Sequence, residues 1–361
     1  MSDHPAYSAD YRTGRDRFRT ASRARGFRLQ TITIDERADL TIDVAFAGAE
    51  RPDRLVIVSS GLHGVEGFLG SAVQNSLLED PAEAWPLPDD AGLILIHALN
   101  PWGYANLRRF DEANVDLNRN FLLEGQAYSG TPEIYRELDG LLNPPGPPRL
   151  LDLMAIESIP ALWRHGERAL RRAIARGQYD FPRGLFYGGA EPSRVHRVLL
   201  DAYPRWIGGA TQILQLDIHT GLGGWGELVL LLEDTVSAER ARWLADQFAG
   251  IKVEWSGEGI AYPTRGGLGT WCQATFSDRA FDYCCAEFGT YSGRTNLSAL
   301  RAENQAFHWG PSESRSTVRA RRRLVEAFAP ADRSWRAETL ERGRDAVRRS
   351  FAIVLQRGGI G

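Results

Sequence analysis

The chain has 361 residues, of which 43% are hydrophobic and 25% are charged, and its formal net charge at pH 7 is -3. These proportions are those of an ordinary globular protein, which excludes a disordered or collagen-like chain. The slightly acidic balance also argues against a general nucleic-acid binder, because such a protein needs a basic surface to neutralise phosphates.

The first half of the chain predicts strands and helices in alternation. Hydrophobic periodicity predicts a helix over 7–25, strands over 27–34, 39–47 and 54–60, a helix over 67–78, a strand over 92–99 and a long loop over 100–125. The segments 54–60 and 92–99 are continuously apolar, which is typical of strands buried on both faces of a sheet.

The second half begins with the turn-forming stretch NPPGPP (143–148) and continues the alternation. The pattern predicts helices within 150–177 and over 192–206, strands over 211–219 and 227–233, a helix over 237–249, a strand over 281–289, and helices over 296–307, 316–329 and 336–355. Such alternation is typical of the α/β class.

The predicted architecture is a mixed, mostly parallel central sheet flanked by helices. Because no stretch reads as a linker, we expect one domain over 1–361, with a helical insertion at about 143–207 and C-terminal helices at 316–355. Three cysteines without a Cys-x-x-Cys pair predict neither a disulfide framework nor a thiolate zinc site. The N-terminus lacks the apolar core of a secretory signal and no run is long enough to span a membrane, so we expect a cytoplasmic protein with no membrane partner.

The clearest chemical motif is GLHGVEG (61–67), which directly follows the predicted strand 54–60. In α/β sheets ligands bind beyond the carboxyl ends of strands, and the imidazole of His63 with the carboxylate of Glu66 suits zinc. Alone, the pair would be interpreted as a loop histidine and a solvated glutamate. The flanking glycines favour the metal interpretation, since they permit tight turns and close backbone approach.

A catalytic zinc needs a third protein ligand and an open position. His219 ends the apolar strand 211–219 and precedes the glycine-rich TGLGGWG, so it is the candidate, although alone it would be interpreted as a core or edge histidine. Asp217, two residues earlier on the same strand face, could orient His219 or form an unrelated ion pair. His97, within a strand, is interpreted as a hydrogen-bonded core histidine.

Two other catalytic patterns do not fit. The glycines of 221–226 spell G-x-G-x-x-G, but a dinucleotide site requires a helix next, and strand-like ELVLLLE follows. The serine-hydrolase motif G-x-S-x-G does not occur.

Further polar residues stand out between these motifs and after them. Arg108 and Arg109 carry the planar fork that suits oxyanions, and Asn118 and Arg119 follow in NVDLNRN; surface arginines and an Asx-rich turn are the alternatives. Glu287 lies in an otherwise apolar strand, where a carboxylate is costly to bury. It is a candidate general base, with a structural ion pair as the alternative.

The ordered segments GLHGVEG, NPWGY, RR, NVDLNRNF, DIHTGLG and AEFGT, within about 55–290, resemble the zinc carboxypeptidase family (M14, carboxypeptidase A-like), most closely its bacterial DUF2817-type branch. The aspartoacylase and succinylglutamate desuccinylase group is related. The resemblance implies one zinc ion per chain. It also implies residue roles: metal ligands His63, Glu66 and His219, general acid/base Glu287, carbonyl-polarising Arg109 or Arg108, and carboxylate-binding Asn118 and Arg119. Tyr262 is the candidate for the family's pocket tyrosine, which has no secure match.

The expected function is therefore a zinc-dependent hydrolase that cleaves a peptide or amide bond next to a free carboxylate. Metal-activated water would attack, with Glu287 as general base. The alternatives are an N-acyl amino acid deacylase of the aspartoacylase type and a non-catalytic binding protein on the same fold. The expected partner is a small peptide or an N-acyl amino acid, not a nucleic acid, and the sequence does not indicate an oligomeric state.

Overall fold

The computed structural model describes residues 4–81, 87–149, 154–233, 235–255 and 264–355. Within these ranges eight strands form one sheet in the order β1-β2-β4-β3-β5-β8-β6-β7. The strands are β1 Arg28–Asp35, β2 Leu40–Gly48, β3 Arg54–Ser60, β4 Ala91–His97, β5 Gln212–Thr220, β6 Leu228–Leu232, β7 Lys252–Glu254 and β8 Ala280–Phe288.

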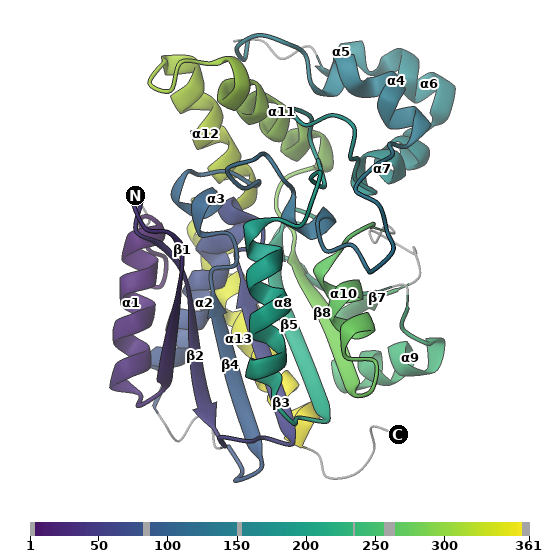
Figure 1. Ribbon diagram of the computed structural model, residues 1–361. Helices are drawn as coiled ribbons and strands as arrows, with labels where there is room; N and C mark the ends of the chain where they lie inside the picture. The colour runs from purple at the N-terminus through teal and green to yellow at the C-terminus, as the bar shows by residue number, and fades with distance from the viewer. Residues whose placement is uncertain (1–3, 82–86, 150–153, 234, 256–263, 356–361) are drawn as a thin grey trace.

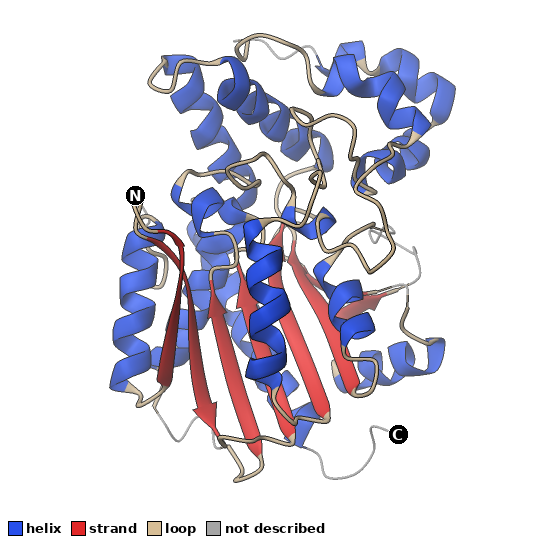
Figure 2. Ribbon diagram, in the orientation of Figure 1, coloured by secondary structure: helices blue, strands red, loops and turns tan. Residues whose placement is uncertain are grey.

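The centre of the sheet is parallel. Strands β4, β3, β5 and β8 run in one direction, whereas β2 pairs with β4 and β6 pairs with β8 in the antiparallel sense. Every residue of β3 and β4 is buried, as expected for strands that are covered on both faces. The predicted class, a mixed and mostly parallel sheet flanked by helices, is therefore confirmed (Figure 2).

Helices cover both faces of the sheet (Figure 1). One face packs against α1 Tyr11–Ala24, α2 Gly67–Glu79, α9 Ala238–Gln247 and α13 Arg333–Leu355, and the other against α8 Arg194–Ile207 and α10 Leu268–Thr275. In α8 the buried residues Val195, Leu199 and Ala202 recur at three- and four-residue spacing, and Ser193 caps the first turn by accepting a hydrogen bond from the His196 backbone.

A second group of helices lies beyond the carboxyl ends of the parallel strands, at the top of Figure 1. It comprises α4 Glu133–Leu142, α5 Met154–Glu157, α6 Ile159–His165, α7 Glu167–Ala175, α11 Gly293–Trp309 and α12 Arg315–Phe328. Tyr135, Leu138, Leu142 and Leu170 form a small core of their own between α4 and α7. The domain boundaries and the insertion at about 143–207 stay predictions.

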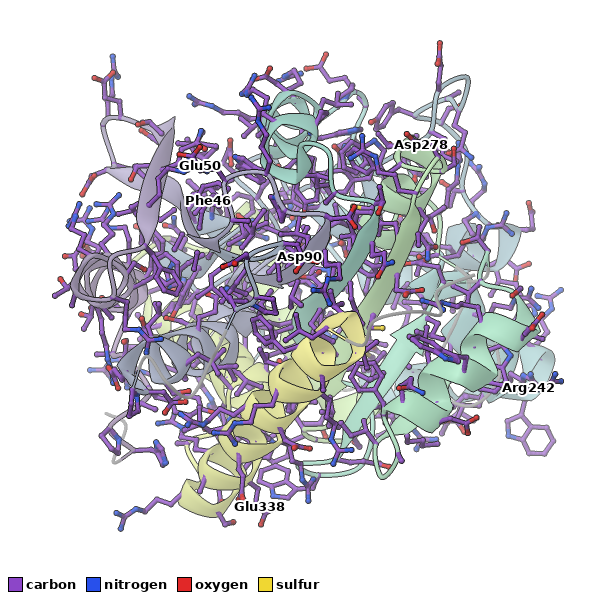
Figure 3. All side chains as sticks on the ribbon, turned by 90° about the horizontal axis from the view of Figure 1, so that it is seen from below. Phe46, Glu50, Asp90, Arg242, Asp278 and Glu338 are labelled. Carbon is purple, nitrogen blue, oxygen red and sulfur yellow. The ribbon has the colours of Figure 1, made fainter. Side chains whose placement is uncertain are left out.

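The opposite edge of the sheet, seen in Figure 3, is where the parallel strands begin. Asp90 and Asp278 lie there, directly before β4 and shortly before β8. Within the described part of the chain, no helix combines the length and the apolar character needed to cross a membrane.

Some elements differ from the prediction. The loop predicted over 100–125 is wrong for α3 Pro101–Ala105, a short helix that starts because Asn100 accepts a hydrogen bond from the Gly103 backbone and Pro101 occupies the first position. The sequence pattern also did not predict α4, α10 or β7. These elements are short, and packing against the rest of the chain stabilises them more than their own periodicity does.

Candidate metal centre

The carboxyl ends of three parallel strands bring the predicted ligands together. After β3, His63 precedes the tight 3-10 turn η1 Gly64–Glu66, which ends at Glu66, and His219 lies at the end of the neighbouring β5. Glu287 lies beside His219 in the register of β5 and β8. The topology thus gathers, at the carboxyl ends of the strands, four side chains that lie between positions 63 and 287 of the sequence, as expected for this class of sheet.

His63, Glu66 and His219 point their ligand atoms at one another. Nδ1 of His63 lies 3.0 Å from Oε1 of Glu66, Nδ1 of His219 lies 3.1 Å from Oε2 of Glu66, and the two nitrogens are 3.2 Å apart. Zinc bonds of about 2.0–2.1 Å in a tetrahedral site would place ligand atoms roughly 3.3 Å apart. The donor set and its spacing therefore fit a zinc ion.

The outer nitrogen of each imidazole determines which nitrogen faces the centre. Nε2 of His219 lies 2.6 Å from Oδ2 of Asp217, so Nε2 carries the proton and Nδ1 keeps its lone pair for a metal. Nε2 of His63 contacts both Oδ1 of Asp116, at 3.1 Å, and Nη2 of Arg109, at 2.7 Å. A guanidinium nitrogen can only donate, so in this geometry Nε2 of His63 accepts from Arg109. If Nε2 is instead protonated and donates to Asp116, Nδ1 of His63 is free to bind a metal.

Asp217 is itself held from several sides. Ser59 donates to its Oδ1 at 2.7 Å, and Tyr283 donates to its Oδ2 at 2.8 Å. Asp217 is completely buried, and a buried carboxylate is stable only when donors surround it, as they do here. Of the two roles that the sequence left open for Asp217, the structure therefore shows the contact with His219.

The structure separates the two adjacent arginines. Nη1 of Arg109 donates to Glu66 at 2.9 Å and its Nε donates to Asp116 at 3.2 Å, so this guanidinium lies in the centre. Arg108 points elsewhere: it is fully buried, donates to Glu303 at 2.7 Å and stacks on the ring of Phe307. Of the two arginines, Arg109 is thus the one that contacts the metal-ligand candidates.

Burial and charge shift the acidities in the centre. Burial raises the pKa of Glu287 to about 7, with a further contribution from the negative charge of Glu66. Burial also opposes ionisation of Glu66, but His63, His219 and Arg109 outweigh it and lower the pKa of that carboxyl. Glu66 therefore tends to stay ionised, whereas Glu287 tends to hold a proton near neutral pH. Two carboxyls with opposite tendencies are found in many acid–base sites.

Glu287 lies 5% exposed at the end of β8. Its Oε1 accepts a hydrogen bond from the Leu222 backbone at 2.9 Å, and its Oε2 faces the thiol of Cys285. His219, Cys285 and Glu287 also place one ligand atom each within 4.8 Å of one another. Cys285 was not among the candidates predicted from the sequence, although its position two residues before Glu287 on a strand predicts that the two side chains share a face.

Asn118 and Arg119 lie in the neighbouring 3-10 turn η3 Leu117–Arg119. Arg119 donates to the backbone carbonyls of Ala175 and Asn118, and no hydrogen bond joins it to the three metal-ligand candidates among the described residues. Oδ1 of Asn118 accepts a hydrogen bond from the Leu268 backbone. Tyr262 lies outside the described residues. Asp116, which precedes this turn, contacts both His63 and Arg109, and the sequence analysis assigned it no role.

Two interpretations made for residues outside the centre agree with the structure. His97 is fully buried, and its Nε2 lies 2.9 Å from the hydroxyl of Ser71. The glycines of 221–226 lead into strand β6 and not into a helix, so they do not form a dinucleotide site.

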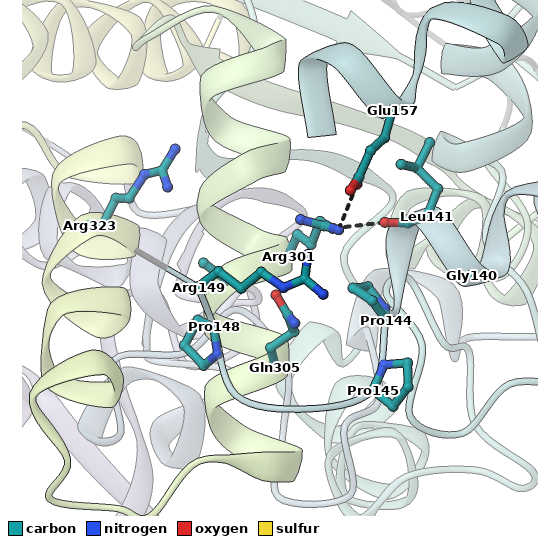
Figure 4. A pocket seen from close by; sticks show the side chains of 11 residues that line it. Gly140, Leu141, Pro144, Pro145, Pro148, Arg149, Glu157, Arg301, Gln305 and Arg323 are labelled. Atoms are coloured by element: carbon teal, nitrogen blue, oxygen red, sulfur yellow. Dashed lines mark hydrogen bonds and ion pairs between the residues drawn. The ribbon is translucent and has the colours of Figure 1, made fainter. Parts of the chain in front are cut away.

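A cavity of about 320 Å³ lies away from this centre, between α11 and the segment that follows α4 (Figure 4). Arg149, Arg301 and Arg323 line it together with Glu157, and Arg301 donates to the Leu141 carbonyl. No residue of the candidate metal centre lines this cavity, so its volume does not describe that centre.

Comparisons with known proteins place the chain in a family. A family model described as "Protein of unknown function (DUF2817)" matches residues 7–342, and the chain belongs to that family. No curated protein matches the sequence.

Solved structures with a similar fold have low sequence identity to this chain. Bovine thrombin-activatable fibrinolysis inhibitor is 12% identical, with 93% of this chain and 98% of the other covered and a TM-score of 0.49. Carboxypeptidase A from Helicoverpa armigera is 12% identical over 89% and 74%, with a TM-score of 0.47. A protein from Shewanella amazonensis SB2B, provisionally described as a metallopeptidase, is 14% identical over 89% and 94%, with a TM-score of 0.45.

Proposed function

We propose that this protein is a zinc-dependent hydrolase that cleaves a peptide or amide bond next to a free carboxylate. The observation that carries the proposal is the convergence of His63, Glu66 and His219 within 4.8 Å beside a buried glutamate. Two histidines and one carboxylate form a common donor set for catalytic zinc. When bound, zinc activates water near neutral pH and polarises a carbonyl.

Glu287 is the proton carrier in this proposal. Its Oε1 is fixed by the Leu222 backbone, so Oε2 is the atom that takes the proton of the attacking water and delivers it to the leaving amine. Because burial raises the pKa of this carboxyl to about 7, it both accepts and releases a proton near neutral pH.

Arg109 is the group that would stabilise the developing oxyanion. Its contact with Asp116 anchors Nε, and the two Nη atoms extend toward Glu66 and His63. A dication bound by those ligands would repel the guanidinium, which favours donation from Nη to a substrate oxygen. Each such donor contributes about 3 kcal/mol to stabilising the transition state.

Asn118 and Arg119 are proposed to bind the free carboxylate of the substrate. The Asn118 amide nitrogen is oriented because its oxygen bonds the Leu268 backbone, and Arg119 is held by two carbonyls. A guanidinium fixed in this way is suited to a carboxylate.

We also place the activity in the cytoplasm, which agrees with three free cysteines.

The first test is metal content. Protein purified without added metal should contain about one zinc ion per chain, and Glu66→Ala should lose it. Release of amine would then be measured on peptides with a free C-terminus, on the same peptides with a C-terminal amide, and on N-acyl amino acids. Preference for the last group would indicate a deacylase. Absence of metal, with no turnover after zinc is added, would overturn the proposal.

Substitution Glu287→Gln tests the proton carrier. The amide cannot accept a proton, so turnover should fall by about 10²–10⁴-fold while the zinc content stays that of the wild type. Both quantities are measured on the same preparation. Turnover within a few-fold of the wild type would exclude Glu287 as the base.

A further inference from the structure

Cys285 and Glu287 form a pair of donors beside the proposed centre. The two residues are separated by one position on β8, so their side chains leave the same face of the strand. Cys284, in between, points to the opposite face and packs fully buried in the core there. Cys285 is only partly buried, and its sulfur faces Oε2 of Glu287.

The distance between these donors suits a shared metal ion. Sγ of Cys285 lies 3.8 Å from Oε2 of Glu287. A tetrahedral zinc ion with a bond of about 2.3 Å to sulfur and about 2.0–2.2 Å to oxygen would place these ligand atoms roughly 3.5 Å apart. The other carboxylate oxygen is fixed by the Leu222 backbone, which keeps Oε2 on the side of the thiol.

We propose that Cys285 and Glu287 form a second site, of lower affinity, for a divalent ion that binds sulfur, next to the centre of His63, Glu66 and His219. Binding there breaks the S–H bond of Cys285 and forms a sulfur–metal bond, and the proton leaves to solvent without any oxidation or reduction. An ion bound at this second site also inhibits turnover, because a coordinated Glu287 cannot accept a proton; this effect rests on the proposed function.

His219 explains why the second site is the weaker one. Its ligand atom lies within 4.8 Å of those of Cys285 and Glu287, but its Nε2 is engaged by Asp217, which leaves Nδ1 as the single nitrogen available. One lone pair binds one ion. When His63 and Glu66 hold an ion together with His219, the second ion keeps two protein donors. When that first ion is absent, His219 completes a set of three donors.

The charge around the pair favours a cation. The buried carboxyl groups of Glu66, Asp116, Asp217 and Glu287 belong to the two adjoining sites, whereas Arg109 is a cationic side chain that contacts Glu66 and Asp116. A second dication would therefore offset the repulsion between Glu66 and Glu287, and thiolate adds a preference for soft ions such as cadmium.

Cadmium titration of the full chain tests the proposal, because cadmium bound to a thiolate gives an ultraviolet charge-transfer band. The wild type should bind two cadmium ions per chain, and the band should appear with the second. Cys285→Ser, close in size to the wild type, should bind one ion without the band. Cys284→Ala is the matched control and should keep both ions and the band. Thermal unfolding checks that each variant is folded.

His63→Ala separates this proposal from the catalytic one. This variant loses the first site, so His219 becomes available and the band should appear with the first cadmium ion. That result does not depend on any hydrolytic activity. One ion per wild-type chain without the band, or a band that persists in Cys285→Ser, would overturn the second site. With an active enzyme, excess zinc should inhibit the wild type at least tenfold more strongly than Cys285→Ser.

Discussion

At the scale of single residues, the centre depends on the partners of its ligands as much as on the ligands. Asp217 receives hydrogen bonds from Ser59 and Tyr283 and fixes Nε2 of His219. The proton on that nitrogen is what leaves the opposite nitrogen free for a metal. The chain thus fixes the orientation of His219 through Asp217, which is not itself one of the candidate metal ligands.

Asp217→Asn should therefore weaken zinc binding by about 10–100-fold while the fold persists. The amide presents an N–H group where the carboxylate accepted from three donors, so at least one of them loses its partner. Zinc affinity would be measured by competition with a chromophoric chelator. Asp282→Asn, which alters a strand carboxylate bonded to Arg240, is the control. Equal affinity in Asp217→Asn and the wild type would contradict this role.

The sequence predicted the four side chains that meet at the strand ends, because His63, Glu66, His219 and Glu287 stand next to apolar strands or within one. It could not separate Arg108 from Arg109, since neighbours of one type have the same local pattern. The choice depends on Glu303, which lies 195 residues further along the chain and takes Arg108 away from the centre. Contacts of this range leave no signal in a short motif.

At the scale of elements, the turn η1 is positioned by the segment around α3. Backbone N–H groups of Gly64 and Val65 donate to the carbonyls of Arg109 and Arg108. A Cβ added to Gly64 would lie 2.1 Å from the carbonyl carbon of Gly103. The glycine of the motif is therefore required by close approach of two backbones, which is the role that the sequence analysis gave to the flanking glycines in general terms.

Gly64→Ala should separate the two segments. Because the clash is with backbone, relief requires a shift that also moves His63 and Glu66, and we expect a loss of about 1–3 kcal/mol in the free energy of unfolding together with weaker zinc binding. Gly140→Ala is the matched control, since a Cβ there meets no atom within 4 Å and lies in helix α4. It should leave zinc binding unchanged and raise stability by up to about 1 kcal/mol. Denaturant unfolding measures the stability of each variant, and competition with a chelator measures its zinc affinity.

The elements that the sequence predicted are those with long apolar or amphipathic patterns, such as β3, β5 and α8. The unpredicted helix α10 has eight residues, includes Gly269, and packs on the ring of Tyr283. Its stability comes from that packing and not from its own composition, which is why local periodicity missed it.

At the scale of the whole molecule, a layer of helices packs on each face of the sheet, and the last helix, α13, contacts parts of the chain that are distant in sequence. Helix α13 crosses the face that also carries α1 and α2, and the indole of Trp335 donates to the Gly289 carbonyl just beyond Glu287. The α1 side of the same layer covers the end of β4, where His97 stacks on Phe18 with ring centroids 5.0 Å apart. Stability of this layer therefore depends on His97 remaining neutral.

His97 should make the protein sensitive to acid. Burial lowers the pKa of this imidazole to about 4, below the 6.5 of an unfolded chain, so between these values the unfolded state binds more protons. The contribution to stability is present above about pH 6.5 and is lost as the pH falls through about 4. Its full size is about 3 kcal/mol.

The measurement is the free energy of unfolding in urea at about pH 7.5 and about pH 4.5. His97→Gln keeps a partner for Ser71 but cannot be protonated, so its stability should fall less over this interval than that of the wild type. His165→Gln, at a histidine that bonds Glu137 among the outer helices, is the matched control for loss of an imidazole. If the free energy of unfolding falls equally with pH in His97→Gln and in the wild type, protonation of another group causes the acid sensitivity. A divergence confined to low pH would instead locate the sensitivity where α1 packs on the sheet, because protonation of His97 charges the ring that Phe18 covers.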